Sequence, residues 1–277
     1  MDDKFGENLN ELTTPPIAQG RTAEIYLWDD GHVLKLYRDG CPADCVEYEA
    51  RVASAIHEAG IPSPAIGEIV EVKSRHGLIY ERLEGVSMLQ DMNARPWLLL
   101  KHARSLANLH VQINQKSITG LPSYKDRLRY DINSSAHLGA DLRDKTLALL
   151  EILPDGKNVC HGDFHPDNVI LTKAGPIVID WMTASAGSPW TDVARTNLLL
   201  SIGPRGAGKL VSPLIKTAIK LYHRIYLNRY HALIPDTKHE LNRWGPVIAA
   251  ARLNEDILPE REALIKVVKE GLNHGIY

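Results

Sequence analysis

The chain has 277 residues, of which 44% are hydrophobic and 24% are charged, and its formal net charge is −2. This length and composition allow a full core in one large or two small lobes, which excludes a disordered or fibrous protein. With 32 basic and 34 acidic residues, the chain has no excess of positive charge to attract a nucleic acid, and it has no polybasic signal for a membrane. We therefore expect a globular protein that binds neither.

The N-terminal part predicts a small sheet with one helix. Residues 17–26 contain a turn around Gly20 between two strands, and residues 32–37 alternate as a strand with Lys35 on one face. A helix is expected from Ala43 to Glu58, because its apolar residues recur at helical spacing and a Gly-Ile-Pro stop signal follows. Two antiparallel strands over 66–72 and 77–83, joined by residues 73–76, complete this part.

The rest of the chain is expected to be mostly helical, apart from a central hairpin. Apolar residues at helical spacing predict helices over 97–115, 124–133, 142–153, 190–202, 207–231, 239–253 and 260–273. The fold class is therefore α+β, with a small N-terminal sheet and a larger helical region.

The most informative segment is the octapeptide His-Gly-Asp-Phe-His-Pro-Asp-Asn at 161–168, which Asp180 follows twelve residues later. Asp163 can accept the proton of an attacking hydroxyl, and Asn168 and Asp180 offer hard oxygen ligands for magnesium. Two apolar strands, 168–171 and 176–180, predict a hairpin that brings Asn168 and Asp180 to the same end. One base and two magnesium ligands are what phosphoryl transfer from a nucleotide needs.

Two other interpretations of the octapeptide are open. The alternation of His161, Asp163, His165 and Asp167 could ligate a transition metal in a hydrolase. Alternatively, the polar residues simply form a turn, as strings of His, Pro, Asp and Asn often do.

The segment resembles the catalytic loop and metal-binding turn of the aminoglycoside phosphotransferase and choline kinase-like family, a branch of the protein-kinase-like fold. In that family the loop contains His-Gly-Asp, and Ile-Asp-Trp or a relative follows it, as at residues 179–181 here. The resemblance implies Asp163 as catalytic base, Asn168 and Asp180 as magnesium ligands, and His161 as a structural residue. Residues 187–194 are similar to the family's Gly-x-Pro-x-x-Asp-Leu-Ala, which implies that Asp192 braces the catalytic loop by hydrogen bonds.

A kinase also needs a strand lysine that contacts the donor phosphates and a helical glutamate that holds this lysine. Lys35 stands at the expected position, and Glu49 is the expected glutamate, with Glu47 as the alternative. In isolation, a strand lysine usually lies at a solvated edge and a helical glutamate on a solvated face. The order of these groups along the chain favours the kinase interpretation.

The nucleotide site has two further parts in this interpretation. Gly20 lets the backbone approach the phosphates while the amides of Arg21 and Thr22 point inward, although a single glycine is also compatible with an ordinary hairpin turn. By resemblance to the family, the backbone of Glu81 and Leu83 bonds the purine. Tyr80 is then expected at the back of the purine pocket, or equally as a core aromatic residue.

The sequence as a whole predicts a protein-kinase-like two-lobe fold, with a nucleotide-binding lobe over 1–83, a hinge at about 81–87 and a catalytic lobe over 88–277. The predicted activity is that of a small-molecule kinase, which transfers the γ-phosphate of ATP or GTP to a hydroxyl with Mg²⁺ as cofactor. The alternatives are a nucleotide-binding pseudokinase and a metal-dependent hydrolase. We expect a monomer or homodimer.

The acceptor pocket is expected in the helical region. Candidate lining residues are Trp181, Asp167, Trp244, Arg252, Glu255 and Asp256, some of which fit a helix core equally well. A polycationic aminoglycoside would need a dense acidic cluster near Asp163, and the acidic residues here are too sparse to establish one.

Three cysteines, an odd number without metal spacing, are typical of a reducing compartment. The acidic N-terminus lacks an apolar stretch. We therefore expect a cytoplasmic location.

Overall fold

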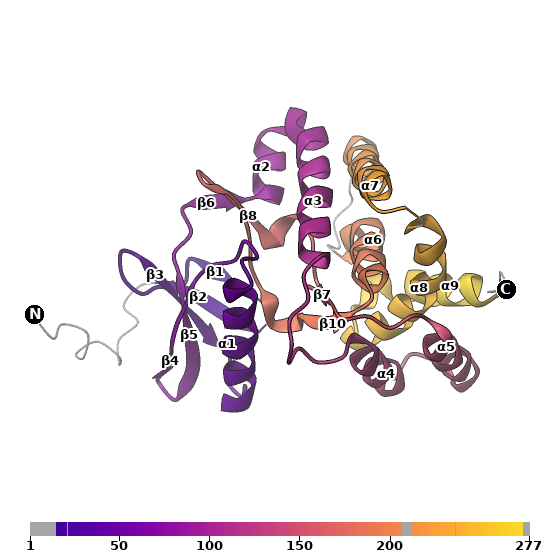
Figure 1. The fold of residues 1–277 in the computed structure, drawn as a ribbon, viewed down its shortest axis with the longest axis horizontal. Helices are drawn as coiled ribbons and strands as arrows, with labels where there is room; N and C mark the ends of the chain where they lie inside the picture. Colours follow the sequence, from indigo (N-terminus) through magenta and orange to yellow (C-terminus); the bar gives the residue numbers. More distant parts are fainter. Residues whose placement is uncertain (1–14, 21, 207–211, 236, 274–277) are drawn as a thin grey trace, which may run out of the picture. The chain divides into compact units, whose positions relative to one another are not determined.

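The computed structural model describes residues 15–20, 22–206, 212–235 and 237–273, and groups the chain into two compact units (Figure 1). The first unit comprises the chain up to Val86 together with Val169–Met182, and the second comprises Ser87–Asn168 and the chain from Thr183 onward. The functional division into a nucleotide-binding lobe over 1–83 and a catalytic lobe over 88–277 stays a prediction.

A five-stranded antiparallel sheet in the order β1-β2-β3-β5-β4 dominates the first unit. Its strands are β1 (Ala18–Gln19), β2 (Ala23–Leu27), β3 (His32–Tyr37), β4 (Ile66–Val72) and β5 (Arg75–Glu81). Strands β3 and β4 have the predicted bounds, whereas β5 begins two residues earlier than expected. The reason is that Lys73 and Ser74, with φ of 51° and 60°, form a two-residue turn that needs both residues at positive φ.

The two faces of this sheet bury different clusters. Leu34 and Leu36 of β3 pack on one face, whereas Tyr37 and Leu78 pack on the other face, against Val46 of α1 (Ala43–Glu58). Helix α1 has the predicted bounds and lies against β4 and β5. Because side chains alternate along a strand, Lys35 shares its face with Tyr37 and thus with α1.

A β-hairpin belongs to the first unit although it lies far along the sequence. It consists of β8 (Val169–Thr172) and β9 (Gly175–Val178), and β6 (Gly85–Ser87) adds a third strand beside β8. A Cβ at Gly85 would lie 2.4 Å from the carbonyl oxygen of Leu171, so only glycine permits this approach. The predicted hairpin is present, with Val169 opposite Val178, but the expected strands over 168–171 and 176–180 are shifted, since Asn168 belongs to a 3-10 turn and Asp180 lies beyond the end of β9.

The second unit is mostly helical. Its helices are α2 (Met88–Ala94), α3 (Leu99–Asn114), α4 (Tyr124–Ser134), α5 (Ala140–Ile152), α6 (Pro189–Gly206), α7 (Pro213–Leu233), α8 (Thr237–Arg252) and α9 (Arg261–Asn273), and β7 (Asn158–Cys160) pairs with β10 (Ser185–Gly187). Short 3-10 turns lie at η1 (Pro96–Leu98), η2 (Pro166–Asn168), η3 (Trp181–Thr183), η4 (Leu253–Glu255) and η5 (Leu258–Glu260).

The seven helices predicted for this region are present with shifted ends. The expected start of one of them, residues 207–211, lies outside the described residues. Helix α2 was not predicted, because its seven residues are too few for a periodic pattern. Ser87 and Gln90 form a capping box at its start. The predicted α+β, protein-kinase-like fold class is confirmed by this arrangement and by the structural comparisons below.

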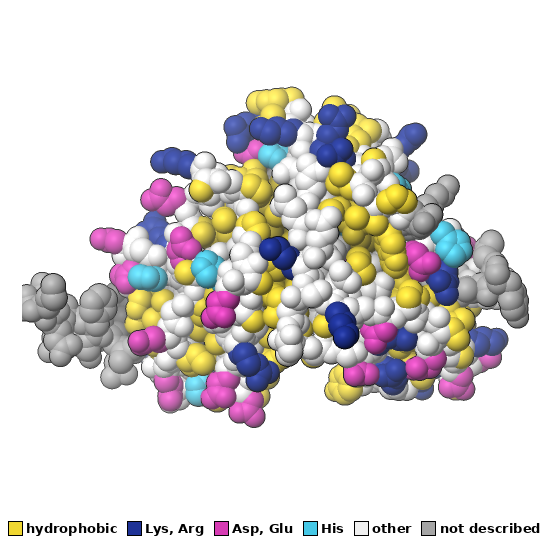
Figure 2. Space-filling model, viewed as in Figure 1, with side chains coloured by type: hydrophobic (Ala, Val, Ile, Leu, Met, Phe, Trp, Pro, Cys, Tyr) yellow, Lys and Arg dark blue, Asp and Glu magenta, His cyan; other side chains and the backbone are white. Residues whose placement is uncertain are grey.

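The core of the second unit is built from helix pairs, principally α3 with α7, α6 with α8 and α8 with α9. The predicted stripe of α3 is buried at Ala103, Leu106 and Ile113. In Figure 2, charged side chains of both signs are interspersed over α4 and α5, where Arg129 pairs with Glu151. Within the described residues, no helix combines the length and the apolar character needed to cross a membrane.

Candidate active site

Lys35 is the centre of a charged cluster in the first unit. Its Nζ donates to Oε1 of Glu49 at 2.7 Å and to Oδ1 of Asp180 at 3.0 Å. The Lys35 and Glu49 side chains are 12% and 1% exposed, whereas that of Asp180 is 48% exposed. The structure thus brings together three of the predicted site residues from β3, α1 and the end of the β8–β9 hairpin.

Two tyrosines complete the surroundings of Glu49. The hydroxyl of Tyr80 donates to Oε1 of Glu49 at 2.8 Å, and that of Tyr37 makes a short hydrogen bond to Oε2. Burial and the neighbouring Glu49 carboxylate raise the pKa of both tyrosines, so both hydroxyls stay protonated as donors. Glu47, the alternative partner for Lys35, is exposed.

Burial by itself would lower the pKa of Lys35, but the charges of Asp180 and Glu49 outweigh it and raise the pKa above its ordinary value. Lys35 is therefore a stable cation. Its positive charge is balanced by one buried carboxylate, Glu49, and by one accessible carboxylate, Asp180.

Asp180 follows β9 in a left-handed backbone conformation, with φ of 65°. The residues after it anchor this turn within the same unit. The indole Nε1 of Trp181 donates to the carbonyl of Val178 at 3.0 Å, and Met182 packs against the cluster that contains Tyr37 and Leu78. The carboxylate is held against Lys35 by one oxygen and is half-exposed.

The expected phosphate-covering turn lies between β1 and β2. The amide of Gly20 is bonded to the carbonyl of Ala23 at 2.8 Å, and its carbonyl accepts from Arg38. Thr22 is exposed, and its carbonyl accepts from the Arg38 amide. Arg21 lies outside the described residues. The role of this turn in phosphate binding stays a prediction.

At the expected hinge, the amide of Glu81 donates to the carbonyl of Ala65 at 2.9 Å, and the Glu81 carboxylate accepts from the Ala65 amide. The sequence analysis expected the backbone of Glu81 and Leu83 to contact the purine. Those contacts stay a prediction.

In the second unit, Asp192 of α6 holds the loop that carries Asp163. Its Oδ2 accepts from the amide of His161 at 2.7 Å, and its Oδ1 accepts from the amide of Gly162 at 2.8 Å. His110 and Asn114 of α3 also bond this fully buried carboxylate. Burial would raise the pKa of Asp192, but the neighbouring His110 lowers it below its ordinary value. The predicted bracing role of Asp192 is confirmed.

Gly162 allows the loop to turn tightly. Its φ is 79°, and a Cβ at this position would lie 2.7 Å from the carbonyl oxygen of Thr183. The hydroxyl of Thr183 in turn donates to the carbonyl of His161 at 2.7 Å. Backbone conformation and close approach therefore both require glycine between His161 and Asp163.

Asp163 lies between two cationic or potentially cationic side chains. Its Oδ2 is 3.5 Å from Nε2 of His165, and its Oδ1 is 3.6 Å from Nη2 of the buried Arg195. Burial would raise the pKa of Asp163, but the hydrogen bond from His165 and the charge of Arg195 hold it well below its ordinary value. The carboxylate is 32% exposed and ionised at neutral pH.

Asn168 ends the same loop and is almost fully buried. Its Nδ2 donates to the backbone carbonyl of Asp163 at 3.0 Å, which fixes the orientation of the amide. Within the described part of the chain, no donor occupies Oδ1 of Asn168. This oxygen is the one expected to bind magnesium.

The transition-metal interpretation of the octapeptide receives no support from this geometry. Among the described residues, no three His, Cys, Asp or Glu side chains converge on a common point. His161 is fully buried, and its Nδ1 accepts from the Asp163 amide. Asp167 accepts a hydrogen bond from Ser87 at 2.7 Å.

A pocket in the second unit lies against the Asp163 loop. We call it the α4 pocket, and it is lined by Gly162 and by nine other residues: Tyr124, Arg127, Leu128, Asp131, Arg195, Ile248, Ala251, Arg252 and Glu255. Of the predicted acceptor-pocket residues, Arg252 and Glu255 are part of it. Trp244 and Trp181 are instead buried core residues, and Asp256 is an exposed partner of Arg261.

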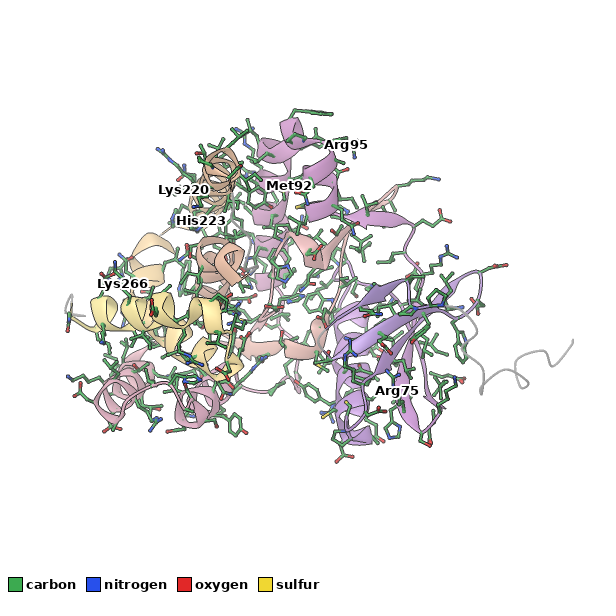
Figure 3. All side chains as sticks on the ribbon, turned by 180° about the vertical axis from the view of Figure 1, so that it is seen from behind. Arg75, Met92, Arg95, Lys220, His223 and Lys266 are labelled. Atoms are coloured by element: carbon green, nitrogen blue, oxygen red, sulfur yellow. The ribbon has the colours of Figure 1, made fainter. Side chains whose placement is uncertain are left out.

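The sequence analysis missed several residues that surround these sites. The sequence analysis assigned Tyr37 to a strand but not to the site. Its position two residues after Lys35 puts both side chains on the α1 face of the strand, which could have identified it. Arg195 lies three residues after Asp192, one helical turn away, a spacing that could have placed it near the same loop. No local signal distinguishes Arg127 from other surface arginines of α4. Figure 3 labels another arginine, Arg75 of β5, which donates to the carbonyl of Tyr37 in β3 and to the carboxylate of Glu24 in β2 and so links three strands of the sheet.

Comparison with known proteins identifies the family. The model of the phosphotransferase enzyme family matches residues 13–214. The chain belongs to this family. Phosphoryl transfer is therefore its reaction class, and the predicted recognition is confirmed. No protein with a curated description matches the sequence.

Solved structures share the fold of this phosphotransferase. One is a thermostable mutant of aminoglycoside phosphotransferase APH(4)-Ia in complex with AMP-PNP and hygromycin B, at 17% identity, with a TM-score of 0.64 and coverage of 95% of this chain and 93% of that chain. ADP-bound APH(2'')-Ib has 17% identity, a TM-score of 0.58 and coverage of 98% and 97%. A choline/ethanolamine kinase family protein from Mesorhizobium loti has 13% identity, a TM-score of 0.58 and coverage of 95% and 94%.

Proposed function

We propose that this phosphotransferase is a kinase that moves the γ-phosphate of ATP or GTP to a hydroxyl of a small molecule. The observation that carries the proposal is the buried Lys35–Glu49 pair with Asp180 on the same lysine. A lysine fixed by a helical glutamate beside a metal-binding aspartate is the arrangement that protein kinases use on donor phosphates. The similar structures that hold AMP-PNP with hygromycin B, or ADP, support this proposal.

The oxygen donors of the two proposed magnesium ligands are each of the kind that Mg²⁺ prefers. Asp180 offers a half-exposed carboxylate, and Asn168 offers an amide oxygen oriented by its own hydrogen bond to Asp163. One or two protein oxygens, with the remaining positions left for phosphates and water, is the usual binding mode of Mg²⁺. When bound, the metal neutralises charge on the phosphates. Lys35 has the same task, and Glu49 keeps its ammonium group in position.

Asp163 is the proposed base. Its low pKa means that it is ionised and able to accept a hydrogen bond from the acceptor hydroxyl, which orients the oxygen for attack on phosphorus. As the new oxygen–phosphorus bond forms and the bond to the nucleoside diphosphate breaks, the hydroxyl proton passes to Oδ of Asp163. Catalysis then comes mainly from positioning and electrostatic stabilisation.

Labelled ATP with magnesium and a panel of hydroxyl compounds tests the proposal. Asp163→Ala is expected to lower turnover by about two to four orders of magnitude with little effect on nucleotide affinity, because a general base contributes in this range. Asp180→Ala is expected to weaken magnesium-nucleotide binding in calorimetry. Normal turnover in the first variant, or unchanged affinity in the second, contradicts the assigned role.

The same assay separates a kinase from a nucleotide-binding pseudokinase. A binding module does not need an ionised carboxylate at the position of Asp163, nor Asp192 and Arg195 to hold it. Binding of ATP without transfer or hydrolysis in the wild-type protein would favour the pseudokinase.

A further inference from the structure

The α4 pocket is close to the proposed base. Gly162, the neighbour of Asp163, lines the pocket, which has a cavity volume of about 20 Å³. Arg195 bonds the Gly162 carbonyl through Nε and lies 3.6 Å from Asp163 through Nη2. Arg127 bonds the Thr183 carbonyl at 2.8 Å, which is the oxygen that approaches Gly162. A molecule in this pocket is therefore next to the catalytic loop.

The carboxylates of the pocket are already engaged. Glu255 accepts from Arg195 through Oε1 and from Arg252 through Oε2. Asp131 accepts from Asn254 at 3.0 Å through Oδ1, and its Oδ2 lies 3.9 Å from Nε of Arg127. Three of these four carboxylate oxygens already accept a hydrogen bond from the protein, so an ammonium group of a ligand would compete with these donors.

The arginines of the pocket are engaged to different degrees. Arg252 uses Nε and both Nη atoms on Glu260 and Glu255, so it has little left for a ligand. Arg127 is 38% exposed, and among the described residues no acceptor bonds its Nη2. The charge of Arg252 is matched by Glu255 and Glu260, and that of Arg195 by Glu255 and Asp163, whereas the carboxylate nearest to Arg127 is that of Asp131, at 3.9 Å. Arg127 is thus the group most able to bind an anion.

We propose that the acceptor carries an anionic group, either a carboxylate or a phosphate monoester, beside the hydroxyl that is phosphorylated, and that Arg127 binds this group. The inference rests on the proposed function, because it names the substrate class of the same site. A guanidinium group suits both anions, since it can present two parallel N–H donors to two oxygens. Polycationic aminoglycosides do not fit this pocket.

Calorimetry without nucleotide tests the inference on the full chain. The anionic probes are gluconate, glycerate and glucose 6-phosphate, the neutral counterparts are glucose and glycerol, and the cationic probes are choline and hygromycin B. We expect at least one anionic probe to bind about 10- to 100-fold more tightly than its neutral counterpart, the range of a charge-assisted hydrogen bond. The gluconate and glucose 6-phosphate arms distinguish a carboxylate from a phosphate.

Arg127→Gln and Arg129→Gln form a matched pair of variants. Both arginines lie on α4 and both side chains are 38% exposed, but Arg129 pairs with Glu151 and Asp126 and does not line the pocket. Arg127→Gln is expected to abolish the preference for the anionic probe over its neutral counterpart, whereas Arg129→Gln keeps it. Arg127→Lys retains the charge without the planar fork, and is expected to keep part of the preference.

The ratio of affinities for the anionic and the neutral probe also separates binding from folding. Arg127 bonds Thr183, so its loss can disturb the loop, but such damage would weaken both probes alike. The inference is refuted if no anionic probe exceeds its neutral counterpart, if a cationic probe binds best, or if Arg127→Gln and Arg129→Gln behave alike. Failure of the proposed function is a different result: the anion binds through Arg127, but labelled ATP transfers no phosphate to it.

Discussion

Glu49→Ala should destabilise the protein far more than Asp180→Ala, although both residues bind the same lysine. Glu49 is 1% exposed and accepts hydrogen bonds from Lys35, Tyr37 and Tyr80. Asp180 is 48% exposed and holds Lys35 through one oxygen. The comparison contrasts a buried partner of Lys35 that also accepts from two tyrosines with an exposed partner of the same lysine.

The expected loss of stability depends on which buried groups each substitution leaves without a partner. Removing one partner of a buried ion pair costs about 3–5 kcal/mol, because the other charge stays buried without compensation. The hydroxyls of Tyr37 and Tyr80 also lose their acceptor, and each unsatisfied buried group costs about 1–3 kcal/mol. Glu49→Ala is therefore expected to lose at least about 3 kcal/mol. Asp180→Ala is expected to change stability by about 0–1 kcal/mol, as for an exposed pair.

Urea unfolding followed by circular dichroism measures the difference. With a slope of about 1–3 kcal/mol per molar urea, the Glu49→Ala midpoint should fall by about 1 M or more. Tyr80→Phe is a control that removes one hydrogen bond and keeps the ion pair, and it should cost about 1 kcal/mol. Equal midpoints for Glu49→Ala and Asp180→Ala would show that burial does not govern this cluster, and would refute the reasoning.

Two further predictions concern the catalytic loop. Because the pKa of Asp163 lies below its ordinary value, its stabilising effect is complete above about pH 4 and is lost as the pH falls through the folded pKa. The pH–rate profile should therefore show no loss of activity from protonation of Asp163 between about pH 5 and 8, and an acid limb abolished by Asp163→Asn would contradict this. Gly162→Ala should lower thermal stability by about 1 kcal/mol or more, through its positive φ and the approach of Thr183, whereas Gly139→Ala, where a Cβ meets nothing within 4 Å, serves as the control in the same melting experiment.

Much of the local structure could be predicted because it depends on spacing along the chain. The alternation of residues 32–37 and the apolar periodicity of residues 43–58 predict β3 and α1 with the bounds that the structure has. The turn at Lys73 and Ser74 could not be placed to the residue, since neither side chain typically favours positive φ. Helix α2 was too short for a periodic signal.

Sequence alone determined the kinds of chemical group present and their order: a strand lysine, a helical glutamate, the His-Gly-Asp loop and the later Asp180. Tertiary structure decided which of them touch. In the folded chain, Lys35 bonds Glu49 and not Glu47. The hydroxyls of Tyr37 and Tyr80 donate to the same Glu49 carboxylate, and His165 and Arg195 lie beside Asp163. The physical reason is that burial and contact distance set the strength of a charge and the pKa of a group, and both arise from packing between segments far apart in the chain.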